Sequence, residues 1–201
     1  QQSIVHIGIL LVQSVINSFG STAIAGYSAG MRIESLSIVP MLSMGNAMST
    51  FTAQNMGAGK IDRVKEGYRM CYVIVLTAGA VLCVMYQLAG GAFVSLFLDS
   101  GSSEAYSVGL SYVKFLSFFY SFIGLKASTD GLLRGAGDVT AFTVANLVNL
   151  AIRVSVTNLF APIYGIQVAW MAVPLGWAAN YVISFGWYLT GKWKKVRVIK
   201  K

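Results

Sequence analysis

Ionisable side chains that interrupt long apolar segments are the first candidates for chemistry in this sequence. Arg32, Glu34, Lys114 and Arg153 each fall inside such a segment. A charged residue at membrane depth costs about 2.5–3.5 kcal/mol on insertion scales and usually faces a cavity or a partner. Because Arg32 and Glu34 are two residues apart, they point to different sides of a helix. We therefore expect Glu34 to reach Arg153 on another helix. The two would form a proton-sensitive pair or a structural ion pair, or their side chains would snorkel to the membrane interface.

A second group of charges lies near the end of a later segment. Lys126, Asp130 and Arg134 follow one another at intervals of four residues, which places them on one helical face. Asp130 is therefore a candidate coupling residue. The alternative is a solvated cluster of charges near the cytoplasmic end of the helix.

Two further sets of side chains have the spacing needed to line a cavity. Asn146 and Asn149 are three residues apart, and Met41, Met44 and Met48 recur at i, i+3 and i+7, so each set shares a helix face. Flexible thioethers suit a pocket that accepts ligands of several shapes, although methionine is also ordinary packing material. We keep both sets as candidates for substrate contact, with helix packing as the alternative.

The stretch AQNMGAGKIDRVKEGYR, residues 53–69, contains a glycine–lysine pair typical of phosphate-binding loops. A P-loop would need a glycine at position 54 and a hydroxyl at position 61, where Gln54 and Ile61 stand. The stretch is better explained as the end of one helix and a short turn to the next, because glycine commonly ends a helix.

The same pattern occurs twice, as GAG at 57–59 and at 135–137. We expect both copies to be structural turn motifs, formed by Gly57, Gly59, Arg134, Gly135 and Gly137. Gln54 and Asn55, beside the first turn, either bond carbonyl groups freed at the helix end or contact substrate.

The elements that must position these residues are membrane helices. Hydrophobic residues make up 56% of the 201 residues and charged residues 11%, whereas soluble domains carry about 25% charged residues. Each apolar segment approaches the ~20 residues that cross a bilayer as a helix. Six can be drawn, at roughly 3–19, 25–53, 70–90, 105–126, 139–160 and 165–190.

The predicted fold is therefore all-α: a polytopic membrane protein with six transmembrane helices over residues 1–191 and a basic tail at 192–201. Pro40 and Pro174 interrupt two of the segments and would act as hinges or as static kinks. The chain opens on an apolar block without an initial Met, which indicates a fragment or a processed chain.

The distribution of charge predicts the orientation. The net charge is +8, which in a soluble protein would point to nucleic acid. Here Lys and Arg gather in alternate connections and in the tail, at 57–69, 126–138 and 192–201, and the other three connections contain none. This is the positive-inside pattern. We predict that these regions and both termini are cytoplasmic, that the protein contacts membrane lipid, and that nucleic acid is not a partner.

Little in the sequence points to catalysis. It contains one histidine, seven acidic residues and neither H-E-x-x-H nor G-x-S-x-G. Cys71 and Cys83 fall in one apolar block and are expected to be free thiols. We expect no enzyme activity, no metal site and no cofactor.

Four stretches resemble the multidrug and toxic compound extrusion (MATE) transporters. They are INSFGSTAIAGYSAGMRIESLSIVPM, STFTAQNMGAGKIDRVKEGYR, LLRGAGD and NLVNLAIRV, which follow one another in order along nearly the whole chain. The resemblance implies twelve transmembrane helices in two six-helix lobes around a central cavity, with this chain as the C-terminal lobe and an N-terminal six-helix lobe missing.

The resemblance also implies a function: exchange of drug-like, often cationic, amphipathic small molecules for protons or sodium ions. Some branches of the family bind a cation with acids in the seventh and tenth helices. The corresponding seventh-helix stretch here, QQSIVHIGILLVQS, has no acid, and Asp130 has no fixed correspondence to the tenth-helix acid. The alternative is a lipid or polyisoprenoid flippase of the related superfamily, whose cavity would require several cations, such as Arg32, Lys114 and Arg153.

Overall fold

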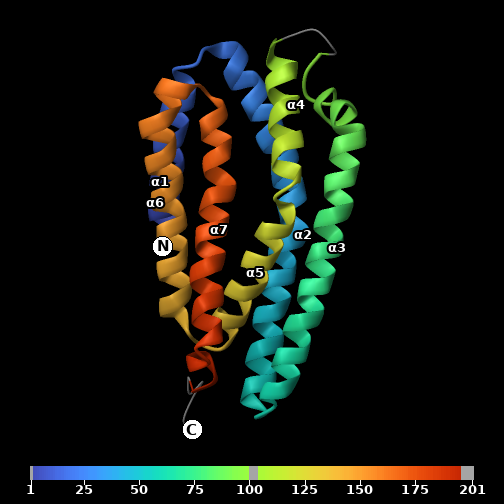
Figure 1. Cartoon of the computed structure of the whole chain (residues 1–201), viewed down its shortest axis with the longest axis vertical. Helices are drawn as coiled ribbons and strands as arrows, with labels where there is room; N and C mark the ends of the chain where they lie inside the picture. The colour runs from blue at the N-terminus through green and yellow to red at the C-terminus, as the bar shows by residue number, and fades with distance from the viewer. Residues whose placement is uncertain (1, 100–103, 196–201) are drawn as a thin grey trace.

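The fold is entirely helical in the part of the chain that the computed structural model describes. That part comprises the backbone of residues 2–99 and 104–195 and the side chains of residues 10–99 and 104–194. No strand occurs in these residues, so the predicted all-α class is confirmed (Figure 1). The helices are α1 (Gln2–Asn17), α2 (Ser21–Gly57), α3 (Ile61–Val94), α4 (Glu104–Ser117), α5 (Tyr120–Gly135), α6 (Val139–Tyr164), α7 (Gln167–Leu189) and the short 3-10 helix η1 (Lys192–Lys195).

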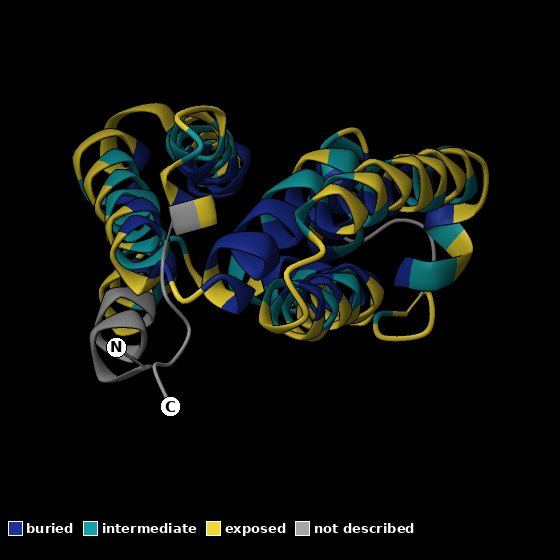
Figure 2. Ribbon diagram, turned by 90° about the horizontal axis from the view of Figure 1, so that it is seen from below, coloured by how far each residue is buried: buried dark blue, intermediate teal, exposed yellow. Residues whose placement is uncertain are grey.

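The helices form two groups. Helices α2, α3, α4 and α5 pack on one another, and α1 and α7 pack on α6. Viewed from below, the groups stand side by side (Figure 2). Helix α5 joins them, because it contacts α7 as well as α2 and α3, and it is buried along most of its length. Residues on α5 can therefore contact both groups of helices.

The segment predicted at 105–126 is not one helix. It is divided at residues 118–119 into α4 and α5, which are bent by 53° relative to each other. Helix α5 then continues to Gly135, so most of the predicted 126–138 connection is helical. The prediction was wrong here because the break lies in the run Phe118–Phe119, without the proline or glycine that normally signals one.

The other predicted segments correspond to α1, α2, α3, α6 and α7, with boundaries that differ. Helix α2 has 37 residues and α3 has 34, so the charged stretch after Lys60 forms the first turns of α3 rather than a connection. Among the described residues, three helices are long and apolar enough to cross a membrane: α3, α6 and α7. If the bent α4–α5 pair is counted as a single span, the number of candidate spans rises to four. Helix α1, with 16 residues, is shorter than such a span.

Both GAG sequences end helices, as predicted. At the first, the Gly59 N–H donates to the Met56 carbonyl at 3.0 Å and the Lys60 N–H to the Asn55 carbonyl at 2.7 Å. This is the Schellman arrangement, in which a glycine in the left-handed region closes the helix. Gly59 has φ 71° and Gly137, at the second copy, has φ 83°. The two turns and the C-terminal helix end lie at the same end of the molecule (Figure 1), which agrees with the alternation of basic connections.

Close packing through glycine fixes α5 and α4 against α2. A Cβ atom at Gly131 of α5 would lie 2.9 Å from the carbonyl carbon of Gly45 in α2, and one at Gly30 of α2 would lie 2.8 Å from Cγ of Tyr112 in α4. Such contacts let helix backbones approach closely in a membrane. The first of them brings Lys126, Asp130 and Arg134 next to α2.

Candidate transport site

A polar pocket lies between α2, α5 and α6. Its volume is about 260 Å³, and we call it the α2–α5–α6 pocket. It contains three charged side chains together with amide and apolar groups. The lining residues are Leu42, Gly45, Asn46, Lys126, Ala127, Asp130, Gly131, Arg134, Phe142 and Asn146.

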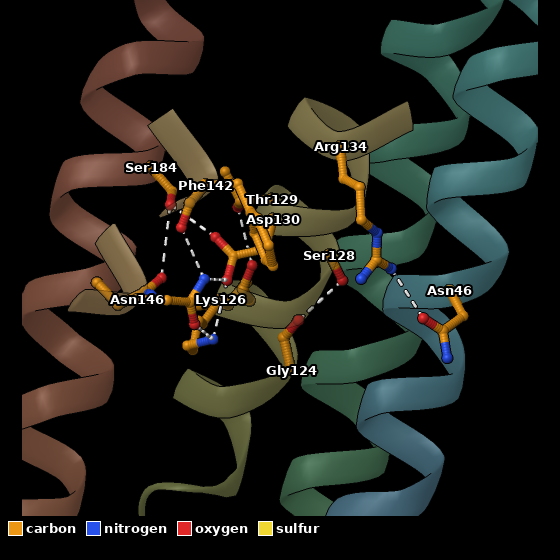
Figure 3. A network of polar contacts seen from close by, with 12 residues as sticks. Asn46, Gly124, Lys126, Ser128, Thr129, Asp130, Arg134, Phe142, Asn146 and Ser184 are labelled. Atoms are coloured by element: carbon orange, nitrogen blue, oxygen red, sulfur yellow. Dashed lines mark hydrogen bonds and ion pairs between the residues drawn. The ribbon is translucent and has the colours of Figure 1, made fainter. Parts of the chain in front are cut away.

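The Lys126–Asp130 ion pair lies in this pocket and is largely shielded from solvent (Figure 3). Lys126 Nζ lies 2.9 Å from Asp130 Oδ2 and donates to Asn146 Oδ1 at 3.2 Å. Asn146 Nδ2 donates to the Phe142 carbonyl at 2.8 Å and to Asp130 Oδ2 at 3.4 Å. The Lys126 ammonium thus lies between two oxygen atoms, Asp130 Oδ2 and Asn146 Oδ1.

Helix α7 completes the network from the other side of Asp130. Ser184 Oγ donates to Asp130 Oδ1 at 2.7 Å and lies 3.5 Å from Asn180 Oδ1. Both carboxylate oxygens of Asp130 are therefore bonded, one toward α7 and the other toward α5 and α6. Asp130 connects the two helix groups through a single side chain.

The predicted charge cluster is reorganised in the structure. Asp130 is only 4% exposed, so the interpretation as solvated charges is wrong for this residue. Arg134 has no ion pair with Asp130 among the described residues. Its Nη2 donates to Asn46 Oδ1 at 2.8 Å, and its guanidinium carbon lies 5.6 Å from the centre of the Phe142 ring. Arg134 contacts neighbouring helices rather than Asp130 because those helices offer a hydrogen-bond acceptor and an aromatic ring.

Glu34 and Arg153 are not in direct contact. No salt bridge joins these two described side chains, although Arg153 is close enough for an electrostatic interaction with Glu34. Glu34 is buried and accepts a hydrogen bond from the Tyr112 hydroxyl of α4. The prediction of a directly bonded Glu34–Arg153 pair is therefore wrong, since the hydroxyl of a neighbouring helix lies closer than the guanidinium.

The two predicted asparagines have different surroundings. Asn146 lines the α2–α5–α6 pocket, whereas Asn149 packs against Gly176 of α7, where a Cβ atom would lie 3.1 Å from the Asn149 backbone oxygen. Asn149 Oδ1 and Asn180 Nδ2 are buried without a hydrogen-bond partner among the described residues. Only Asn146 thus joins the site that contains Asp130.

The three methionines do not line the α2–α5–α6 pocket. Met41 and Met48 are buried in the apolar core. Met44 and Met48 border a separate, mostly apolar pocket of about 280 Å³ between α2 and α3. A contact of these methionines with substrate stays a prediction.

The remaining predicted positions have local structural surroundings. Asn55 Nδ2 donates to the Phe51 carbonyl at 2.8 Å, as expected for a residue near a helix end, and Gln54 is exposed. Pro40 and Pro174 lie inside the continuous helices α2 and α7, and Pro174 also borders an apolar pocket beside the α4–α5 break. Their role as hinges stays a prediction.

The sequence did not indicate three side chains that bond the candidate ionisable residues. Ser184, Tyr112 and Asn46 bond Asp130, Glu34 and Arg134 from other helices. Serine and asparagine side chains form hydrogen bonds between membrane helices. Nothing in their spacing identifies the partner, because the contacts depend on how the helices pack.

A bundle of long apolar helices with a buried, ion-paired pocket has the architecture of a membrane transporter. The model of the MatE protein family matches residues 2–160 of this chain. Because this match covers most of the chain, the chain belongs to the MatE family, and it is a multi-pass membrane protein of a transporter family. The resemblance seen in the sequence is confirmed.

One similar protein is the probable multidrug resistance protein YpnP of Bacillus subtilis. It is 28% identical over 199 residues, which cover 98% of this chain and 44% of that protein. The chain thus spans less than half of the length of this relative.

Solved structures of the family share the fold. A multidrug resistance MATE family transporter in an outward-facing conformation matches with a TM-score of 0.85 at 16% identity, covering 94% of this chain and 42% of that chain. An inward-facing conformation of a multidrug resistance MATE family transporter matches with a TM-score of 0.81 at 17% identity, covering 93% and 42%. The fold is that of one lobe of a MATE transporter.

Proposed function

We propose that this chain is one lobe of a secondary-active exporter that moves drug-like, often cationic amphipathic compounds across the cytoplasmic membrane. Export is driven by exchange with protons or sodium ions. The second, N-terminal six-helix lobe is the partner with which this lobe encloses the transport cavity. The basic connections and the C-terminus face the cytoplasm, in line with the positive-inside pattern.

The observation that carries the proposal is the Lys126–Asp130 ion pair on α5, whose side chains also bond helices of the other group. Asp130 bonds Asn146 of α6 both directly and through Lys126, and it bonds α7 through Ser184. A proton on Asp130 would remove its charge and release the Lys126 ammonium. Because these bonds join the groups, such a change would favour a different arrangement of the helices. A ligand shifts a conformational equilibrium only through such differential interactions.

The same pair favours the proton over sodium as the coupling ion. The Lys126 ammonium already lies between Asp130 Oδ2 and Asn146 Oδ1. A sodium ion would have to displace it, whereas a proton needs only to bind the carboxylate. Sodium coupling is the alternative within this proposal.

The test is gradient-driven transport by the full-length protein in inverted vesicles. Ethidium uptake would be driven separately by an imposed proton gradient and an imposed sodium gradient, in wild type and Asp130→Asn. We expect proton-driven uptake in wild type and its loss in the variant. The matched control is Asp62→Asn, because Asp62 forms an exposed ion pair with Lys65 outside the pocket.

If proton-driven uptake survives in Asp130→Asn, Asp130 is not part of the coupling mechanism. If only a sodium gradient drives uptake, sodium rather than the proton is the coupling ion. Absence of uptake with either ion and several cationic dyes would favour the second candidate, a lipid or polyisoprenoid flippase. The observation in favour of the flippase is that the α2–α5–α6 pocket contains two cationic side chains and one anionic one.

A further inference from the structure

The α2–α5–α6 pocket offers hydrogen-bond donors to a ligand, while each oxygen of its acid is already hydrogen-bonded. Asp130, the acid of the pocket, has Oδ1 bonded by Ser184 and Oδ2 bonded by Lys126 and Asn146. Lys126 and Arg134 remain as two cations against this single anion. The pocket therefore has an excess of positive charge, and each carboxylate oxygen of its acid already accepts at least one hydrogen bond.

Arg134 is held in place at the exposed side of this pocket. Asn46 of α2 accepts from Nη2 at 2.8 Å, Ser49 lies 3.4 Å from Nε, and the Phe142 ring of α6 lies below the guanidinium carbon at 5.6 Å. A guanidinium group has five N–H donors, so these contacts leave donors available. Asn46, exposed at the same rim, uses Oδ1 for Arg134 and has its amide Nδ2 group without a hydrogen bond among the described residues.

Part of the pocket wall is apolar. Leu42 of α2 and Phe142 of α6 line it beside the charged groups. A ligand with an anionic head and a hydrocarbon body would place its head against Arg134 and its body against these side chains. Arginine is well suited to this because its planar fork matches the two oxygens of a carboxylate or phosphate.

We propose that the α2–α5–α6 pocket binds the phosphate or carboxylate group of an anionic amphiphile, with Arg134 as the principal anion contact and Asn46 as a second donor. This inference goes beyond the proposed transport function, because it assigns the charge of a bound group and does not depend on the coupling ion. Such a group comes either from the headgroup of an anionic lipid or from a free amphiphilic anion.

The experiment compares two soluble probes of opposite charge and equal chain length, hexyl phosphate and hexylammonium. Binding to the purified full-length protein in phosphatidylcholine nanodiscs would be measured by calorimetric titration. We expect hexyl phosphate to bind at least about tenfold more tightly than hexylammonium, since hydrogen bonds to charged groups are stronger than those between neutral groups. Equal affinity for the two probes would overturn the proposal.

Two variants test the assigned residues. Arg134→Gln removes the cation, and we expect the affinity for hexyl phosphate to fall about tenfold or more. Asn46→Asp keeps an acceptor for Arg134, and therefore the α2–α5 contact, but neutralises the excess charge, so it should cause a similar loss without unfolding. The control is Arg63→Gln, an exposed cation on α3 outside the pocket. Unchanged affinity in Asn46→Asp would contradict the assignment.

The source of the anion is decided by repeating the titration in phosphatidylglycerol nanodiscs. If lipid headgroups occupy the pocket, hexyl phosphate binds more weakly there, and Arg134→Gln retains less phosphatidylglycerol in native mass spectrometry. If the natural ligand is a free anion, affinity is the same in both kinds of nanodisc. Either result supports the site, and absence of specific binding in both overturns it.

Asp130→Asn separates this inference from the transport proposal. The substitution removes the anion of the pocket, so it should preserve or strengthen hexyl phosphate binding while transport is lost. Loss of both hexyl phosphate binding and transport would contradict only the anion site. Retention of both would contradict only the coupling role of Asp130.

Discussion

Glu34 and Asp130 are both buried carboxylates in a membrane protein, but they are held in different ways. Asp130 has an ammonium group at 2.9 Å and a hydroxyl at 2.7 Å, with an amide at 3.4 Å. Glu34 accepts one hydroxyl, from Tyr112, and interacts with Arg153 only at longer range. The first carboxylate has three donors, and the second depends on a single one.

The difference also concerns which helices are connected. The bonds of Asp130 reach α7 through Ser184 and α6 through Asn146, so they cross between the helix groups. The hydrogen bond of Glu34 joins α2 to α4 within one group. A change of charge at Asp130 would therefore act on the contact between groups, and a change at Glu34 on the packing inside one group.

The largest effect is expected from Lys126→Met. It leaves Asp130 buried without its counter-charge, and removing one partner of a buried ion pair costs about 3–5 kcal/mol. The measurement is thermal unfolding of the full-length protein in detergent. Lys65→Met, in the exposed pair with Asp62, is the matched control. A loss no greater than that of the control would mean that Asp130 is less dependent on Lys126 than its burial indicates.

Tyr112→Phe should have an intermediate effect. The substitution removes the hydroxyl that bonds Glu34, and an unsatisfied buried group costs about 1–3 kcal/mol. Thermal unfolding measures the change, with Tyr164→Phe as the control because Tyr164 is 71% exposed. If Glu34→Gln in the Tyr112→Phe background restored none of the lost stability, the unpaired carboxylate would not be the cause.

A smaller effect is expected for the coupling between Glu34 and Arg153. A double-mutant cycle with Glu34→Gln and Arg153→Gln should give a coupling energy below about 0.5 kcal/mol, since residues without direct contact are nearly additive. The same cycle on Lys126 and Asp130 should give a clearly larger value. Equal coupling in the two cycles would remove the distinction between the two carboxylates.

The smallest effect is expected at Asp62→Asn. Its ion pair with Lys65 is exposed on one turn of α3, and water and salt screen such pairs. We expect no measurable change in the unfolding temperature or in ethidium transport. A change in transport alone would show that charge at this end of the molecule affects function without affecting the fold.

Much of the fold follows from local sequence patterns. The two GAG turns end α2 and α5 because a glycine at the left-handed position closes a helix in almost any context. The break at 118–119 could not be predicted, since it arises where α5 leaves α4 to pack between the groups. No local residue encodes that direction.

For the candidate site, the sequence by itself determined which residues are ionisable within apolar helices and which share a face. It placed Lys126 next to Asp130, because residues four apart on a helix are neighbours whatever the tertiary structure. Only the tertiary structure decided that Ser184 and Asn146 complete the coordination of Asp130, that Arg134 turns to Asn46, and that Tyr112 rather than Arg153 bonds Glu34. These contacts join different helices, and the distances between helices depend on glycine packing and on the bend between α4 and α5.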